Sequence, residues 1–202
     1  MALAAPLSLV SASSPRAFVD FDERLVSAQA GVIIVRAPVE AHGPIVAHAS
    51  RRLRTSGFHF VDAAVRTGAP LFREVAMHLG LGAVPVDPAV CADAIAAAAV
   101  AQRAAIVGPL PKERTWDRAV AIELAKNTRL LLVFVTESEP RLGDPSFASA
   151  DRRLLVGESQ DVFDFAAELA PGDKLRWLSA VAEQAQTELP AADLRSLEAW
   201  WA

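Results

Sequence analysis

Residues 31–57, GVIIVRAPVEAHGPIVAHASRRLRTSG, contain the pattern that decides the fold of this 202-residue chain. The β-branched run at 31–35 lies between a glycine and a polar turn, and it predicts a strand covered on both faces, as in a parallel sheet. A helix is predicted to begin at Pro44 and to end before Gly57, because proline favours the first helical position and glycine the position after the last. Strand, turn and helix in this order predict an α/β fold.

Strand-like and helical segments alternate along most of the chain. This alternation is typical of βαβ units and predicts a mostly parallel sheet flanked by helices. Asp87 and Thr115 are expected to cap helices at their starts, and Asn127 is expected to end one in a left-handed conformation. The other expected strands are 58–65, 104–107, 129–135 and 154–156, and the other expected helices are 16–30, 69–81, 88–103 and 116–127.

The chain is expected to divide into three parts. Residues 1–15 combine Ser, Ala and Pro without a sustained period, which predicts a loose arm. Residues 16–157 carry the strand–helix alternation and should form the α/β core. From Ser159 on the pattern is helical only, beginning with DVFDFAAEL at Asp161. Residues 158–202 are therefore expected to form a helical, lid-like segment.

Composition excludes several classes of protein. The formal net charge of −4 gives no basic field, so direct binding of nucleic acid or of an anionic membrane is not expected. Cys91 is the only cysteine, so no intramolecular disulfide can form, and this residue is expected in the core. No apolar run reaches the roughly 18–20 residues of a membrane span, and no cationic region precedes the first apolar residues. A cytoplasmic location is expected.

Two segments resemble a known family. RAFVDFDERLVSA at 16–28 looks like the lead-in of AAA+ and STAND-type P-loop ATPases, and GVIIVRAPVEAHGPIV at 31–46 looks like their first strand and phosphate loop. The resemblance implies a P-loop NTPase-like core followed by a lid. Laying the GxxxxGK[ST] pattern over the sequence places Ala37 at the first glycine, with Pro38 after it. His42, Gly43 and Pro44 then fall at the second glycine, the lysine and the Ser/Thr.

The chemistry of the phosphate loop is missing from these positions. The loop works because its backbone N–H groups surround the phosphates, its lysine neutralises charge and its hydroxyl holds Mg²⁺. Gly43 supplies no cation, Pro44 supplies neither hydroxyl nor N–H, and Glu40 places a carboxylate where polyphosphate would sit. The resemblance also implies an acidic pair after strand 104–107, but Gly108 and Pro109 stand there. The chain is therefore expected to be a pseudo-ATPase with no catalytic residues, no metal and no cofactor.

The rest of the chain follows the family outline. LLLVFVTES resembles the strand that carries the sensor-1 residue, with Thr136 at that position. Residues 151–169 resemble the last core strand leading into the lid. A doubly wound α/β domain unrelated to P-loop proteins remains an alternative.

Two groups of residues are candidates for interaction. Arg51, Arg52 and Arg54 could meet an acidic partner, although cations in a last helical turn also complement the negative end of the helix. Trp200 and Trp201 cannot both face one core stripe, so one of them should meet another surface. The four histidines do not have the spacing of a zinc site, and His48 is expected to be a partly buried, hydrogen-bonded side chain.

The sequence therefore favours a non-hydrolysing P-loop-like module acting in protein–protein interaction or regulation. Its partner would be another protein or a further domain of a longer chain, and the oligomeric state stays open. The alternative is a STAND-type regulatory switch that binds ADP or ATP at an unconventional site between core and lid. An enzyme of unrelated chemistry is a third hypothesis.

Overall fold

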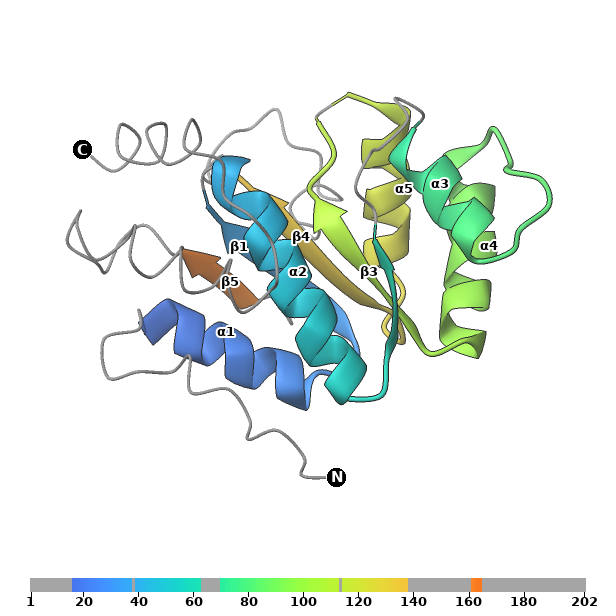
Figure 1. The fold of residues 1–202 in the computed structure, drawn as a ribbon. Helices are drawn as coiled ribbons and strands as arrows, with labels where there is room; N and C mark the ends of the chain where they lie inside the picture. Colours follow the sequence, from blue (N-terminus) through green and yellow to red (C-terminus); the bar gives the residue numbers. More distant parts are fainter. Residues whose placement is uncertain (1–15, 38, 63–69, 113, 138–160, 165–202) are drawn as a thin grey trace.

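The computed structural model describes residues 16–37, 39–62, 70–112, 114–137 and 161–164. They form a three-layer α/β arrangement in which a parallel sheet is covered by helices on both faces (Figure 1). In chain order the elements are α1 (Arg16–Ser27), β1 (Gly31–Arg36), α2 (Val39–Thr55), β2 (His59–Asp62), α3 (Leu71–His78), α4 (Pro88–Ala101), β3 (Ala104–Pro109), α5 (Trp116–Ala125), β4 (Leu131–Thr136) and β5 (Asp161–Asp164).

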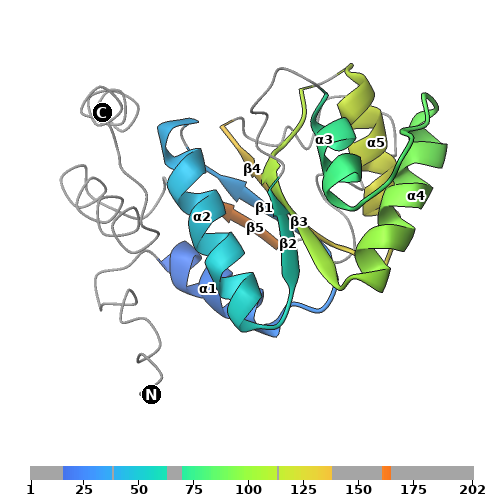
Figure 2. The same ribbon diagram turned by 45° about the vertical axis from the view of Figure 1, so that its right-hand side comes forward.

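The sheet has five parallel strands in the order β2-β3-β4-β1-β5. Helices α1 and α2 cover one face, and α3, α4 and α5 cover the other (Figure 2). The predicted parallel sheet with flanking helices is thus confirmed. The expected helical segment at the C-terminus and the expected arm at 1–15 lie outside the described residues.

Alternation along the central strands divides the core between the two faces. In β1, Ile33 and Val35 point to α1 and α2, whereas Val32 and Ile34 point to the opposite face. All four side chains are buried, as the continuous β-branched run predicts for a strand covered on both sides. The other central strands, β3 and β4, alternate in the same way.

The helices bury stripes of residues spaced three or four apart. In α1 the buried stripe contains Phe21 and Leu25, and Ala28 continues it just after the helix, because this spacing places side chains on one side of a helix. Helix α4 is apolar on nearly all sides, with Asp93 as its one charged residue, and its buried stripe consists of three alanines, one isoleucine and one cysteine. Cys91 belongs to this buried stripe and is fully buried, so the prediction that it is a core residue is confirmed.

Most predicted helix ends are confirmed. The Asp87 carboxylate accepts hydrogen bonds from the backbone N–H groups of Ala89 and Val90, and the Thr115 hydroxyl accepts one from Arg118. Gly57, at φ +80°, ends α2 in a left-handed conformation that costs other residues free energy. The prediction that Asn127 ends a helix in a left-handed conformation is wrong. Its side chain instead accepts a hydrogen bond from the backbone N–H of Arg129.

The start of α2 and the end of β3 differ from the predictions. Helix α2 begins at Val39, so Pro44 lies inside it. Strand β3 continues through Gly108 and Pro109 instead of stopping before them. This continuation needs no N–H from the proline, because the backbone N–H of Leu110 makes the next hydrogen bond, to the carbonyl of Val135.

The predicted helix at Asp161 is also wrong at its start, because residues 161–164 pair with β1 as an edge strand. The sequence DVFD alternates polar and apolar residues, which suits a strand with one covered face. Phe163 is buried on that face, with its ring 5.5 Å from that of Phe21. The predicted strand at 154–156 lies outside the described residues.

Candidate functional site

The carboxyl edge of the sheet brings together the positions that the P-loop comparison singled out. The backbone N–H of Ala37, just after β1, donates to the carbonyl of Thr136 at the end of β4 over 2.9 Å. Pro109, at the end of β3, is in register with Val135 of β4. Ligands of open α/β sheets bind outside this edge. The three positions therefore meet where a nucleotide site would be expected.

The chain between β1 and α2 is helical where the pattern requires an open loop. Only residues 37 and 38 separate the two elements, and His42, Gly43 and Pro44 all lie within α2. Pro44 is tolerated because it removes only one hydrogen bond, close to the start of the helix. Pro38 and the side chain of Glu40 lie outside the described part of the structure. From Gly43 on, a backbone N–H can bond to a carbonyl four residues earlier in the helix, so only the N–H groups of the first turn stay outside the helical pattern.

The side chains at these positions also differ from those of a phosphate loop. Ala37 is buried, and its carbonyl oxygen lies 2.9 Å from His42 Nε2. The His42 ring therefore folds back over the strand end. Gly43 is exposed, and a Cβ added to it would meet no atom within 4 Å. Among the described residues at this junction, none contributes the lysine or the hydroxyl that a phosphate loop requires.

The arginine cluster on α2 does not form one uniform surface. Arg51 and Arg54 are exposed, whereas the Arg52 guanidinium turns inward and binds both carboxylate oxygens of Asp22. Arg52 and Arg54 lie in the last turn, where cations complement the helix dipole. Trp200 and Trp201 lie outside the described residues.

Asp22, His48 and Arg52 form a buried cluster between α1 and α2. Asp22 Oδ1 lies 2.9 Å from His48 Nε2 and accepts a hydrogen bond from Arg52 Nε over 2.6 Å. Asp22 is only 5% exposed and His48 only 3%, which confirms the prediction that His48 is hydrogen-bonded. Burial works to raise the pKa of Asp22, but the hydrogen bonds and charges of His48 and Arg52 outweigh burial and lower it. The carboxylate thus stays ionised inside the protein.

This cluster was missed by the sequence analysis, which had no pattern linking α1 to α2. Asp22 lies beyond the first turn of α1, so it contributes little to capping that helix. The one available signal was an Asp, a His and an Arg on the apolar sides of two neighbouring helices. In the described part of the structure, the Asp22 carboxylate is bound by His48 and Arg52, and both of these partners come from α2. The geometry therefore gives it a structural role.

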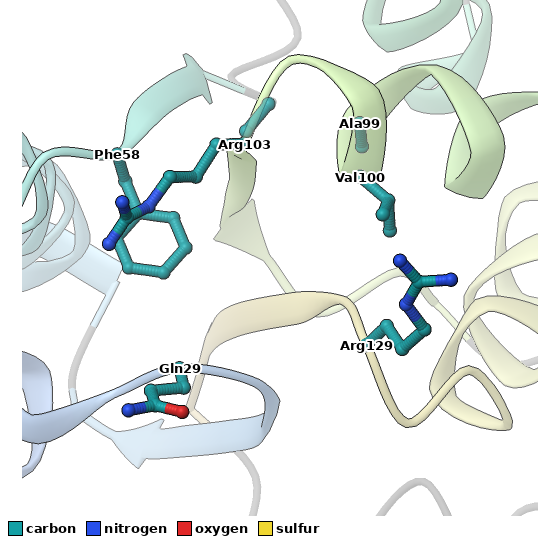
Figure 3. Close-up of a pocket in the computed structure, with 7 residues that line it drawn as sticks. Gln29, Phe58, Ala99, Val100, Arg103 and Arg129 are labelled. Atoms are coloured by element: carbon teal, nitrogen blue, oxygen red, sulfur yellow. The ribbon is translucent and has the colours of Figure 1, made fainter.

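A pocket of about 400 Å³ opens at the opposite, amino edge of the sheet (Figure 3). Its polar lining consists of Gln29, Arg103 and Arg129, each placed just before a strand begins. Phe58 and the last turn of α4 supply the apolar part. Sequence analysis missed this pocket as well, because its residues come from four separate connections.

Other chemistries find no support among the described residues. They contain no group of three or more His, Cys, Asp or Glu side chains that could hold a metal ion. Burial raises the pKa of the Cys91 thiol, helped by the charge of Asp117 and opposed by that of Arg73, so this cysteine is a poor nucleophile. None of the described helices has the length and apolar character needed to cross a membrane.

The fold and these sites define an α/β protein with a parallel sheet flanked by helices. No protein-family model, curated protein or solved structure matches the chain.

Proposed function

We propose that the chain is a non-hydrolysing P-loop-like module, a pseudo-ATPase that acts in protein–protein interaction or regulation. The observation that carries the proposal is the start of α2 at Val39. Helical turns take the place of the phosphate loop, and the side chains at Gly43 and Pro44 offer neither cation nor hydroxyl. The positions of the loop lysine and of the Mg²⁺-binding hydroxyl therefore contribute nothing to binding polyphosphate.

The order of the strands supports the P-loop part of the proposal. The resemblance assigns the phosphate loop to the end of β1, the acidic pair to the end of β3 and the sensor-1 residue to the end of β4, so these three strands should be neighbours in the sheet. Strand β4, which ends at Thr136, lies between β1 and β3. A fold retained without its phosphate chemistry is typical of a domain that is used for its surface.

Exposed apolar side chains support the interaction part. Among the described residues, Met77, Val86 and Val90 are 71%, 79% and 55% exposed. They lie on α3, on the following loop and on the first turn of α4. Apolar side chains exposed to this degree are favourable contacts for another protein.

Calorimetric titration with Mg-ATP and with ADP tests the proposal. We expect no heat of binding from the carboxyl edge, and binding there tighter than about 100 μM would overturn the proposal. Acid treatment of the purified protein would release any bound nucleotide, and ion-exchange chromatography of the extract should show no ADP or ATP. Co-purified nucleotide would instead favour a STAND-type switch.

A four-substitution variant provides the matched comparison: Ala37→Gly, His42→Gly, Gly43→Lys and Pro44→Thr restore the full phosphate-loop pattern. Because glycines weaken the start of α2 and lysine supplies the missing cation, nucleotide affinity should rise above that of the natural chain. The single variant Gly43→Lys serves as control, since it adds the charge while leaving the helix intact. Its affinity should stay close to that of the natural chain.

A further inference from the structure

The pocket at the amino edge is lined by two arginines and by no acidic residue. Arg103 and Arg129 face the same hollow, with the Gln29 amide as the third polar group. The formal net charge of the whole chain is −4, so the positive charge of this pocket is opposite in sign to the net charge of the protein. Neither guanidinium forms an ion pair with a carboxylate of the described residues. Two unpaired positive charges beside one cavity favour an anion as its ligand.

Arg103 is held in place before any ligand arrives. Its backbone adopts φ +50°, a left-handed conformation that non-glycine residues rarely adopt, and its carbonyl accepts the N–H of His59 over 3.1 Å. The guanidinium lies over the Phe58 ring, 5.2 Å from its centre (Figure 3). This stacking restricts the side chain while leaving its N–H groups available.

Arg129 approaches the pocket from another connection. Its backbone N–H is bound by the Asn127 side chain over 2.9 Å, which fixes the turn before β4. Figure 3 shows its side chain rising toward Val100, away from the stacked pair of Arg103 and Phe58. The two arginines therefore come from different parts of the pocket rim.

We infer that this pocket binds a small organic molecule through its phosphate group. Guanidinium groups bind phosphate oxygens in pairs of parallel hydrogen bonds. Arg129 would hold the phosphate, and the charge of Arg103 across the pocket would add attraction for the anion. A volume of about 400 Å³ lies within the range of small-molecule pockets. Phe58 and Val100 would contact the apolar part of the ligand.

Helices α2 and α4 end at this edge and contribute partial negative charge there. An anion is therefore bound through the two guanidinium groups rather than through helix dipoles. Substitution of an arginine should therefore weaken anion binding directly.

Titration of the full chain at low ionic strength with inorganic phosphate, glycerol phosphate and succinate tests the inference. Both phosphate probes should bind, with glycerol phosphate the tighter, because it also contacts the apolar wall. Succinate should bind more weakly than either. Absence of phosphate binding at about 10 mM would overturn the inference, as would tighter binding of succinate.

Two substitutions locate the site. Arg129→Gln should weaken phosphate binding about tenfold or more, and it removes no described side-chain contact. Val100→Glu should weaken binding similarly, because it introduces a competing carboxylate. Arg73→Gln is the matched control, since Arg73 also lies near an aromatic ring, that of Trp116, but outside the pocket. An equal loss in Arg73→Gln would overturn the inference.

The same variants keep this inference separate from the proposed function. If the natural chain binds ATP and Arg129→Gln abolishes that binding, the nucleotide is held by its phosphates at the amino edge. The inference then stands, and the proposed function stands with it. ATP binding that survives Arg129→Gln, without phosphate binding, would count against both.

Discussion

The two faces of the sheet are held to their helices in different ways. On one face, α1 and α2 share the buried cluster of Asp22, His48 and Arg52. On the other face, α3, α4 and α5 are joined by hydrogen bonds at their ends, where the Asp117 carboxylate accepts the N–H groups of Leu71 and Phe72. On the first face, the contact between α1 and α2 includes one buried ionised group, Asp22. On the second face, the polar contacts lie at the ends of the helices and the interior is apolar.

Asp22→Ala should produce the largest effect. Removing the carboxylate leaves the Arg52 charge and the His48 ring partly or fully buried without their partner, so the free energy of unfolding should fall by about 3–5 kcal/mol. Urea denaturation of both proteins measures the change. Asp93→Ala, at an exposed position on α4, is the control and should change stability by less than about 0.5 kcal/mol.

A double variant separates the charge from the packing. Asp22→Leu with Arg52→Leu should be less destabilised than Asp22→Ala, because it leaves no buried guanidinium unpaired. A larger loss in the double variant would show that shape, rather than charge pairing, holds α1 on α2.

Acid should weaken the first face. The folded-state pKa of Asp22 lies below its ordinary value of 3.8, so the ionised form contributes its full stability above that pH. This contribution is lost as the pH falls through the lowered folded-state pKa. The stability difference between the natural chain and Asp22→Asn should therefore stay constant above about pH 5 and shrink as the pH falls below about 4. A difference that does not change with pH would contradict this account.

On the second face, Asp117→Ala should lower the free energy of unfolding by about 1–2 kcal/mol. The Pro70 position that precedes α3 offers no side-chain cap, so the two backbone N–H groups depend on Asp117. Hydrogen exchange should accelerate in α3 first. Asp117→Asn keeps one acceptor oxygen and should lose about half as much; equal losses would indicate that the charge, not the hydrogen bonds, is responsible.

Substitution of a glycine within α2 and of the glycine just after it should give the smallest effects on stability, in opposite directions. Gly57→Ala should cost about 1 kcal/mol because of the left-handed conformation at φ +80°. Gly43→Ala should instead gain about 0.4–1 kcal/mol, since the position is helical, exposed and open. Thermal melting of both variants checks the signs. A loss in Gly43→Ala would mean that this glycine is needed in a non-helical loop.

Local patterns were sufficient for much of the fold. The β-branched run of β1, the caps at Asp87 and Thr115 and the stop at Gly57 each depend on residues within a few positions of one another. The early start of α2 could not be predicted in this way. Pro44 is a strong helix-start signal, but here Ala41 is buried and His42 contacts Ala37, which extends the helix backward.

The candidate sites were harder to predict because their residues are distant in sequence. Asp22 lies 26 residues from His48 and 30 from Arg52, and nothing in either helix alone indicates that pairing. The amino-edge pocket likewise combines turns that precede four different strands.

By itself, the sequence determined that a parallel sheet forms, that helices cover both of its faces, and that lysine and hydroxyl are missing after its first strand. These properties follow from residue type and short-range spacing. Tertiary structure alone decided which charges are buried together and which arginines share a cavity, because such contacts depend on how separate strands and helices are placed in space.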